Sequence, residues 1–224
     1  LEVFLNHMGA KISGAGTDVI RIEGVEKLYG VEHTIIPDRI AAGTYLAAAA
    51  ITGGSVVLRN VCPQHMQSML TALEEMGSTL YVEKNRIMIS PGKKLRGLDM
   101  IRTMPYPGFP TDIQSPFMAL CCVAEGSSMF VENIFENRFQ HVEELVRMGA
   151  DIKVDGRVAV VRGVEKLSGA KVVAKELRGG AALIVAALAA EGTTEIEQIH
   201  YIDRGYESPE KVLQACGANI RRKE

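Results

Sequence analysis

A proline-rich segment that ends in a carboxylate is the first feature of the chain that could do chemistry. Three prolines and a glycine lie between Met104 and Asp112, and Thr111 and Asp112 then open an apolar stretch. Because proline restricts the backbone, this segment would hold the carboxylate in a fixed place, where it could accept a proton from a substrate hydroxyl. Asp112 could equally do no more than cap the following helix, since Thr and Asp both favour helix N-termini.

Three arginines at other junctions of the chain could bind an anion. Arg138 lies between two phenylalanines, Arg178 precedes two glycines, and Arg204 follows an aspartate. Guanidinium groups bind carboxylates and phosphates through paired hydrogen bonds, so converging arginines would suit a multiply charged anionic substrate. Arg138 could instead form a surface cation–π pair with its aromatic neighbours.

Two further interpretations concern the surroundings of these arginines. Gly179 and Gly180 stand at a predicted helix start, where their backbone N–H groups would be open to an anion. Alternatively, each arginine only pairs with a local acid such as Glu136, Glu176 or Asp203, an arrangement common on protein surfaces.

A unit that recurs about every 70 residues must position these side chains. A helix-like stretch followed by a glycine occurs four times in phase, at Met8-Gly9, Met76-Gly77, Met148-Gly149 and Cys216-Gly217. Each unit predicts, in order, an alanine-rich helix, a strand, an amphipathic helix and two further strands. The alanine-rich helices are expected at 40–50, 115–124 and 181–190, and the amphipathic helices at 64–76, 140–148 and 209–216. The glycine at 149 is expected to end its helix with a positive φ.

Alternating helices and strands predict an α/β or α+β fold. The alanine-rich helices are apolar nearly all round, so they are expected to be buried and walled by three small sheets. Hairpins are expected at 79–90 and 151–162, and the pentapeptide Gly-Val-Glu-Lys-Leu follows a hairpin at both 24–28 and 163–167, which indicates duplication. Residues 1–36 look like the end of a unit without its apolar helix, so we predict two domains, 1–36 and 37–224.

Composition narrows the function further. The 224 residues carry a net charge of −2, which gives no general attraction to nucleic acid or acidic membranes. The longest apolar stretch, at 179–190, is too short to span a bilayer. The four cysteines and five histidines show no metal-ligand spacing, so neither metal nor cofactor is expected; the histidines are expected on the surface or in helices. Free thiols favour a reducing cytoplasm, and a start at Leu1 predicts a fragment of a longer product.

These motifs together resemble one family. The chain resembles the C-terminal half of the UDP-N-acetylglucosamine enolpyruvyl transferases, a branch of the enolpyruvyl transferase (EPT) family. The resemblance covers essentially the whole chain, and six motifs carry it: Gly14-Ala-Gly-Thr-Asp18, Ile36-Pro-Asp-Arg39, Phe109-Pro-Thr-Asp112, Phe135-Glu-Asn-Arg-Phe139, Leu177-Arg178 and Ile202-Asp-Arg-Gly-Tyr206.

The resemblance implies a fold, a reaction and a set of site residues. The family fold has two inside-out α/β domains of three units each, so 37–224 would be most of one domain and 1–36 the end of the partner, catalytic-loop domain. The reaction transfers the enolpyruvyl group of phosphoenolpyruvate to the 3′-hydroxyl of UDP-N-acetylglucosamine and releases phosphate, the first committed step of peptidoglycan synthesis. By resemblance Asp112 contacts that hydroxyl and is the proposed proton acceptor, and the backbone of Ile134 binds the UDP-sugar. Arg138, Arg178 and Arg204 match arginines around the phosphoenolpyruvate.

The resemblance also shows what this chain lacks. The family's N-terminal half, with its lysine–asparagine pair and mobile cysteine loop, is absent, so the chain alone is expected to be inactive. Two alternatives stay open. One is the sister enzyme that acts on shikimate 3-phosphate, whose lysine-glutamate-acid-arginine signature is not found here. The other is a non-catalytic regulatory or scaffold domain on the same fold.

Overall fold

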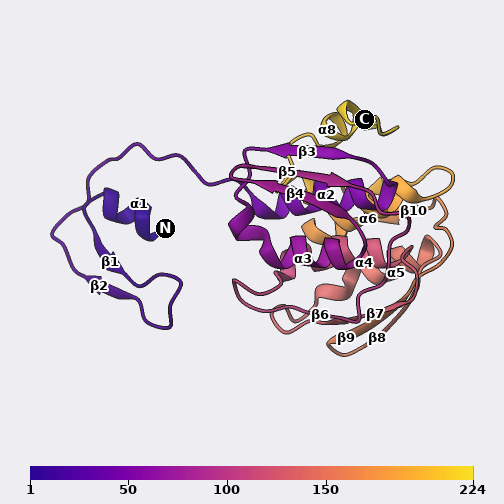
Figure 1. Cartoon of the computed structure of the whole chain (residues 1–224), viewed down its shortest axis with the longest axis horizontal. Coiled ribbons are helices and arrows are strands. Elements are labelled where there is room, and N and C mark those ends of the chain that lie inside the picture. Colours follow the sequence, from indigo (N-terminus) through magenta and orange to yellow (C-terminus); the bar gives the residue numbers. More distant parts are fainter. Residues whose placement is uncertain (224) are drawn as a thin grey trace. The chain divides into compact units, whose positions relative to one another are not determined.

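The chain forms two compact units, residues 1–36 and residues 37–224, in a computed structural model that describes residues 1–223 (Figure 1). The first unit consists of helix α1 (Glu2–His7) and the antiparallel strands β1 (Lys11–Ser13) and β2 (Arg21–Glu23). Asn6 ties the helix to the hairpin, because its amide donates to the carbonyl of Ile12 at 2.7 Å and accepts from the Ile12 N–H at 2.8 Å.

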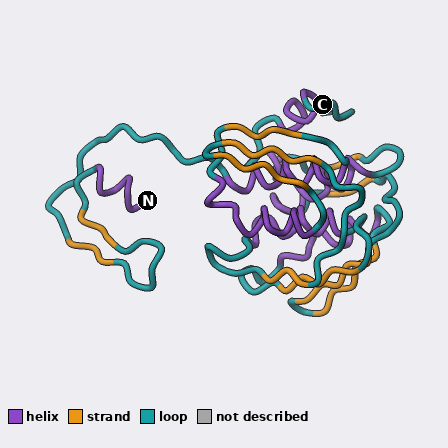
Figure 2. The backbone as a smooth tube through the Cα atoms, in the orientation of Figure 1, coloured by secondary structure: helices purple, strands orange, loops and turns teal. Residues whose placement is uncertain are grey.

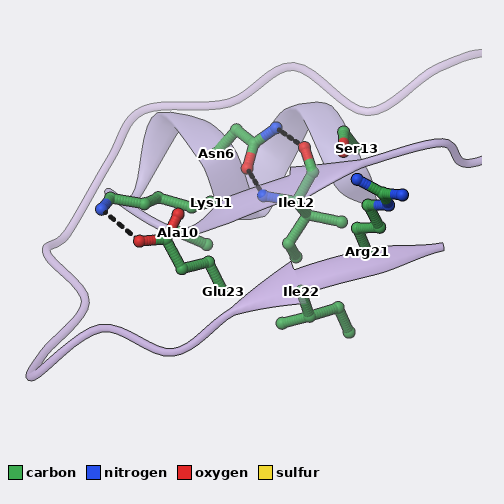
Figure 3. A pocket seen from close by; sticks show the side chains of 8 residues that line it. All are labelled: Asn6, Ala10, Lys11, Ile12, Ser13, Arg21, Ile22 and Glu23. Atoms are coloured by element: carbon green, nitrogen blue, oxygen red, sulfur yellow. Dashed lines mark hydrogen bonds and ion pairs between the residues drawn. The ribbon is translucent and has the colours of Figure 1, made fainter.

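The first unit buries none of its residues. Figure 3 shows the open hollow beside the hairpin, where Lys11 and Glu23 form an ion pair of 2.9 Å. All residues that line this hollow belong to the first unit, and none is a predicted site residue. A segment of this size without buried side chains has no core of its own.

Three helices occupy the centre of the second unit: α2 (Arg39–Thr52), α4 (Thr111–Cys121) and α6 (Leu177–Ala189). Each packs against the other two, and most residues of each are buried, as their all-round apolar character predicted (Figure 1). Small residues allow the close approach. A Cβ at Gly43 would lie 2.8 Å from the sulfur of Met69 and 3.2 Å from the side chain of Ile113.

Three sheets lie outside these helices, which confirms the predicted inside-out arrangement (Figure 2). The first sheet has the strand order β3 (Val56–Arg59), β5 (Arg86–Ser90), β4 (Thr79–Glu83). The second sheet has the strand order β6 (Met100–Arg102), β7 (Ser127–Val131), β9 (Val158–Arg162), β8 (Asp151–Asp155). The third sheet pairs β10 (Lys171–Val173) with β11 (Glu195–Glu197). The remaining helices are η1 (Pro63–Met66), α3 (Gln67–Glu75), η2 (Arg138–His141), α5 (Val142–Arg147), α7 (His200–Asp203) and α8 (Pro209–Ala215).

The predictions of hairpins and of the turn at Gly149 are confirmed, whereas the parallel pairing between strands far apart in the sequence was not predicted. Both predicted hairpins form, and Gly149 follows α5 with a φ of +96°. Strands β6 and β10 were missed. Each has three residues and pairs in parallel with the strand that follows a buried helix, β6 with β7 and β10 with β11. Such short strands carry no alternating pattern, and their pairing depends on the helix between them. Residues 37–224 therefore contain two β-α-β crossovers, β6-α4-β7 and β10-α6-β11, each around a central helix.

Across residues 1–223, no helix has both the length and the apolar character that crossing a membrane requires.

Candidate active site

Arg138 is the centre of the polar cluster at the N-terminal ends of α4 and α6. Its side chain is only 5% exposed, although it lies at the start of η2. Its Nε donates to the hydroxyl of Thr111 at 3.1 Å, Nη2 to Oδ1 of Asp112 at 3.3 Å, and Nη1 to Oε2 of Glu176 at 3.5 Å. Its Cζ also lies 4.3 Å from the centre of the Phe135 ring. The predicted cation–π pair is therefore present; Phe135 is 48% exposed, whereas its partner Arg138 is buried and belongs to the cluster.

Asp112 faces two arginines and does not cap its helix. Helix α4 begins at Thr111 with Pro110 as its N-cap, and no side chain makes a capping hydrogen bond there. The interpretation of Asp112 as a cap is therefore wrong. Its Oδ1 lies 3.3 Å from Nη2 of Arg138 and 3.5 Å from Nε of Arg178, while 44% of its side chain stays exposed. This carboxylate is held by two cations and is still open to a ligand.

Glu176 caps α6 and occupies backbone N–H groups at the helix start, where an anion site was predicted beside Gly179 and Gly180. Its carboxylate accepts from the N–H of Arg178 at 2.7 Å and from the N–H of Gly179, and its carbonyl accepts from the N–H of Gly180 at 2.9 Å. The amides are occupied, so the prediction of open N–H groups is wrong. The first glycine instead permits close packing, because a Cβ at Gly179 would lie 2.8 Å from Cβ of His141.

Arg204 stands apart from this cluster. It follows α7 and is exposed, and its side chain makes no hydrogen bond or ion pair with any other residue of the described part of the chain. The adjacent Asp203 pairs with Arg222, at 2.7 and 2.9 Å. The predicted convergence of three arginines is thus present for Arg138 and Arg178 only. Pairing with a local acid holds for Arg138 with Glu176, and not for Arg204 with Asp203.

Glu132 is a member of the site that the sequence did not indicate. It follows β7, only 1% of the residue is exposed, and its carboxylate accepts four hydrogen bonds. The donors are the hydroxyls of Thr103 at 2.8 Å and Thr111 at 3.0 Å and the N–H groups of Ile134 and Phe135, both at 2.9 Å. A glutamate at a strand end is usually solvated, so only its position between the two polar segments could have drawn attention to it.

Ile134 lies in the loop that Glu132 holds. Its side chain is 45% exposed, and its N–H is taken by Glu132. Within residues 1–223 no hydrogen bond uses its carbonyl oxygen. The backbone of Ile134 therefore offers a ligand an acceptor, and its donor is occupied.

His141 packs beside Arg138 and lies in helix η2, in agreement with the expectation that the histidines are on the surface or in helices. It is 2% exposed, and its Nδ1 lies 3.1 Å from the carbonyl of Arg138. A carbonyl can only accept, so Nδ1 carries the proton; Nε2 is buried and has no partner among the described residues. Burial, with a smaller contribution from the charge of Arg138, lowers the pKa of His141 to about 4, so the ring is neutral near pH 7.

The buried cysteines take no part in the site. Cys121 and Cys122 lie at the end of α4 and are almost completely buried. Burial raises the pKa of the Cys121 thiol to about 11 and that of Cys122 further, so both are neutral thiols. In the same part of the chain, 1–223, no three His, Cys, Asp or Glu side chains are grouped to hold a metal ion.

The fold is that of the enolpyruvyl transferases. Residues 1–213 match the family described as EPSP synthase (3-phosphoshikimate 1-carboxyvinyltransferase), and the chain belongs to this family. It is 55% identical over 99% of its length to UDP-N-acetylglucosamine 1-carboxyvinyltransferase 2 of Caldanaerobacter subterraneus subsp. tengcongensis. It is 52% identical, again over 99% of its length, to UDP-N-acetylglucosamine 1-carboxyvinyltransferase of Geobacter metallireducens. The chain spans about half the length of these curated relatives, 53% of each.

Solved structures confirm the expected enolpyruvyl transferase fold. The enolpyruvyl transferase NikO from Streptomyces tendae superposes with a TM-score of 0.86 at 29% identity, over 98% of this chain and 52% of that one. EPSP synthase from Acinetobacter baumannii superposes with a TM-score of 0.77 over 98% of this chain and 54% of its own. At 20% identity, the second likeness concerns the fold alone.

Proposed function

We propose that the full-length protein transfers the enolpyruvyl group of phosphoenolpyruvate to the 3′-hydroxyl of UDP-N-acetylglucosamine and releases phosphate. The observation that carries this proposal is the partly exposed carboxylate of Asp112, which lies within 3.5 Å of the guanidinium groups of Arg138 and Arg178. The names of relatives at 52–55% identity support the UDP-sugar as acceptor. The full-length protein would then carry out the first committed step of peptidoglycan synthesis, in the cytoplasm and without a cofactor.

Asp112 is the proposed proton acceptor. The sugar hydroxyl must lose its proton as its oxygen bonds to the substituted carbon of the enolpyruvyl group, and a carboxylate beside that hydroxyl can take this proton. Asp112 suits the role because two guanidinium groups hold it in place and because nearly half of the side chain is open to a ligand. When the phosphate leaves, its charge needs compensation at the same place.

Arg138 and Arg178 are the proposed partners of the carboxylate and phosphate groups of phosphoenolpyruvate. Fixed guanidinium groups stabilise charge best when they are already in place before the reaction, and Arg138 is held on three sides. Arg204 is proposed as the third arginine by resemblance. Its free, exposed side chain would have to turn toward the substrate.

The backbone of Ile134 is the proposed contact for the UDP-sugar. Because its N–H is bound to Glu132, the contact would be made by the carbonyl, which can accept from a hydroxyl or an amide N–H of the sugar. UDP-N-acetylglucosamine carries both kinds of donor.

The rest of the enzyme is the proposed partner of this chain. Residues 1–36 bury nothing by themselves, and the chain covers about half of its relatives. We assign 1–36 to the end of the catalytic-loop domain and 37–224 to most of the second domain. The chain alone is expected to release no phosphate.

Phosphate release from phosphoenolpyruvate by the full-length protein tests the proposal. The assay is run in parallel with UDP-N-acetylglucosamine and with shikimate 3-phosphate, and Asp112→Asn is the control for the site. Release with the UDP-sugar only is the expected result. Release with shikimate 3-phosphate would identify the sister activity, and release with neither would support the non-catalytic domain.

A further inference from the structure

We propose that Glu132 is a positioning residue that acts through the hydroxyl of Thr111 to hold the guanidinium of Arg138 in its binding orientation. This inference rests on the proposed function, because the orientation matters only if Arg138 binds the anionic substrate. It concerns the Nε–H of Arg138, whose partner is Thr111 and neither Asp112 nor Glu176.

The hydrogen bonds allow only one orientation of the Thr111 hydroxyl. The Glu132 carboxylate is fully buried and accepts from Thr111 at 3.0 Å, while the same hydroxyl oxygen lies 3.1 Å from Nε of Arg138. A guanidinium N–H only donates, so the Thr111 oxygen accepts from Nε, and the one acceptor left for the hydroxyl proton is Oε2 of Glu132. The hydroxyl proton must therefore point to Glu132, and a lone pair of the oxygen faces the Nε–H of Arg138.

The Nε side and the Nη side of Arg138 have different surroundings. Nη1 and Nη2 contact Glu176 and Asp112, whose side chains are 23% and 44% exposed, at 3.5 and 3.3 Å. A bound anion would compete with these two carboxylates for the Nη groups. Nε, in contrast, contacts Thr111, whose hydroxyl is fixed by a carboxylate that no ligand can reach. The plane of the guanidinium can thus stay in place while its Nη partners exchange.

The two carboxylate oxygens of Glu132 accept from different donors, so a substitution can change the contact to Thr111 alone. Oε1 accepts from Thr103, Ile134 and Phe135, whereas Oε2 accepts from Thr111 alone. Glu132→Gln can keep all three bonds to Oε1 and replaces Oε2 by an NH₂ group. The Thr111 oxygen then faces two N–H donors, and its own proton loses its acceptor.

Four variants of the full-length protein separate the contributions. Thr111→Val removes the hydroxyl at nearly constant shape, and Thr111→Ser restores it. Glu132→Gln reverses the polarity at Thr111, and the double variant Thr111→Val/Glu132→Gln tests whether the two residues act as one unit. Glu165→Gln, at an exposed glutamate, is the matched control for the amide substitution.

Two measurements are made on each variant. The first is the KM for phosphoenolpyruvate at saturating UDP-N-acetylglucosamine. The second is the hydrogen-exchange rate of the Arg138 Nε–H, followed by NMR of the ligand-free protein with ¹⁵N-labelled arginine and assigned by its loss in Arg138→Lys. The second readout needs no activity.

We expect Thr111→Val and Glu132→Gln each to raise the KM about tenfold, the effect of one hydrogen bond to a charged group, and to accelerate Nε–H exchange. The double variant should resemble Thr111→Val, because both changes break the same chain of contacts. Thr111→Ser and Glu165→Gln should match the wild type in both measurements.

Unchanged Nε–H exchange in Thr111→Val would overturn the proposal, as would additive effects of the two substitutions on the KM. A merely structural role of Glu132 would lower the stability of Glu132→Gln without this dependence on Thr111. If the wild type released no phosphate, the proposed function would fail, while the exchange rates would still decide whether Glu132 and Thr111 hold Arg138.

Discussion

Arg138 and Arg204 belong to the same proposed site, but they differ in burial and in the number of partners of their side chains. Arg138 is buried, has three hydrogen-bond partners and lies over an aromatic ring. Arg204 is exposed at the end of α7, and its neighbour Asp203 is occupied by Arg222. A buried guanidinium needs compensation in every direction, so its geometry is set before a ligand arrives. An exposed one can turn, and its position is decided by the ligand.

This difference divides the site into a fixed part and an adjustable part. The fixed part consists of Glu132, Thr111, Arg138 and Glu176, and Asp112 stands at its open edge. Preorganised charge is most effective where the reaction develops charge, which is where the proposed proton transfer and phosphate departure occur. Substitutions in the fixed part should therefore change the rate, or disturb the orientation of Arg138 and with it the affinity for substrate. Substitutions in the adjustable part should change affinity alone.

The largest effect is expected for Asp112→Asn in the full-length protein. The amide keeps the size of the side chain and removes the proton acceptor, so kcat should fall by about 10² to 10⁴. UDP-N-acetylglucosamine binding, measured by calorimetry, should change much less. An equal loss of turnover and of sugar binding would mean that Asp112 orients the sugar and does not take its proton.

The fixed part should also depend on pH through His141. Burial lowers the pKa of this ring to about 4, below the value of about 6.5 in an unfolded chain. Because the native state disfavours the charged ring, its contribution to stability is fully present above about pH 6.5 and is lost as the pH falls toward 4. The free energy of unfolding should decrease by up to about 3 kcal/mol over this range.

Urea unfolding of the wild type and of His141→Asn at several pH values measures this effect. The amide of asparagine can still donate to the carbonyl of Arg138, but it does not titrate. Between pH 6.5 and 4, the free energy of unfolding of the variant should therefore decrease much less than that of the wild type. Identical slopes for both proteins would show that other groups carry the acid sensitivity.

The adjustable part is tested by Arg204→Ala. Because the Arg204 side chain is exposed and forms no hydrogen bond or ion pair within residues 1–223, its loss should leave the melting temperature unchanged. The KM for phosphoenolpyruvate should rise about tenfold, as for the loss of one charge-assisted contact, while the KM for the UDP-sugar stays the same. An unchanged KM for phosphoenolpyruvate would remove Arg204 from the proposed site.

The parts of this molecule that the sequence predicted are those that depend on neighbouring residues. The hairpin of β8 and β9 and the turn at Gly149 follow from short patterns, and the buried helices follow from their composition. Strands β6 and β10 could not be predicted, because three residues show no period and their partners lie across a helix.

The site shows the same limit. Asp112, Arg138 and Arg178 were predicted from residue type, and the structure brings them together. Glu132 was missed because its four partners come from three separate segments, and no spacing in the sequence reveals such a meeting. His141 was expected on the surface or in a helix, and its burial depends on α6, which packs against it at Gly179.

The smallest effect is expected for Arg222→Ala. This variant tests whether the ion pair of Arg222 with Asp203 prevents Asp203 from pairing with Arg204. Both members of the Asp203–Arg222 pair are 39% exposed, and such pairs contribute less than about 1 kcal/mol. The melting temperature should therefore fall by no more than about 2–4 °C. The released carboxylate of Asp203 would then be free to pair with Arg204, and the KM for phosphoenolpyruvate should rise about twofold.

Arg221→Ala is the control for this variant, because Arg221 is an exposed neighbour that forms no ion pair within residues 1–223. It should leave both the melting temperature and the KM as in the wild type. A KM that rises equally in both variants would reflect the general loss of positive charge near the C-terminus. A rise in Arg222→Ala alone, which disappears in Arg222→Ala/Asp203→Asn, would show that Arg222 keeps Arg204 available by occupying its nearest competitor.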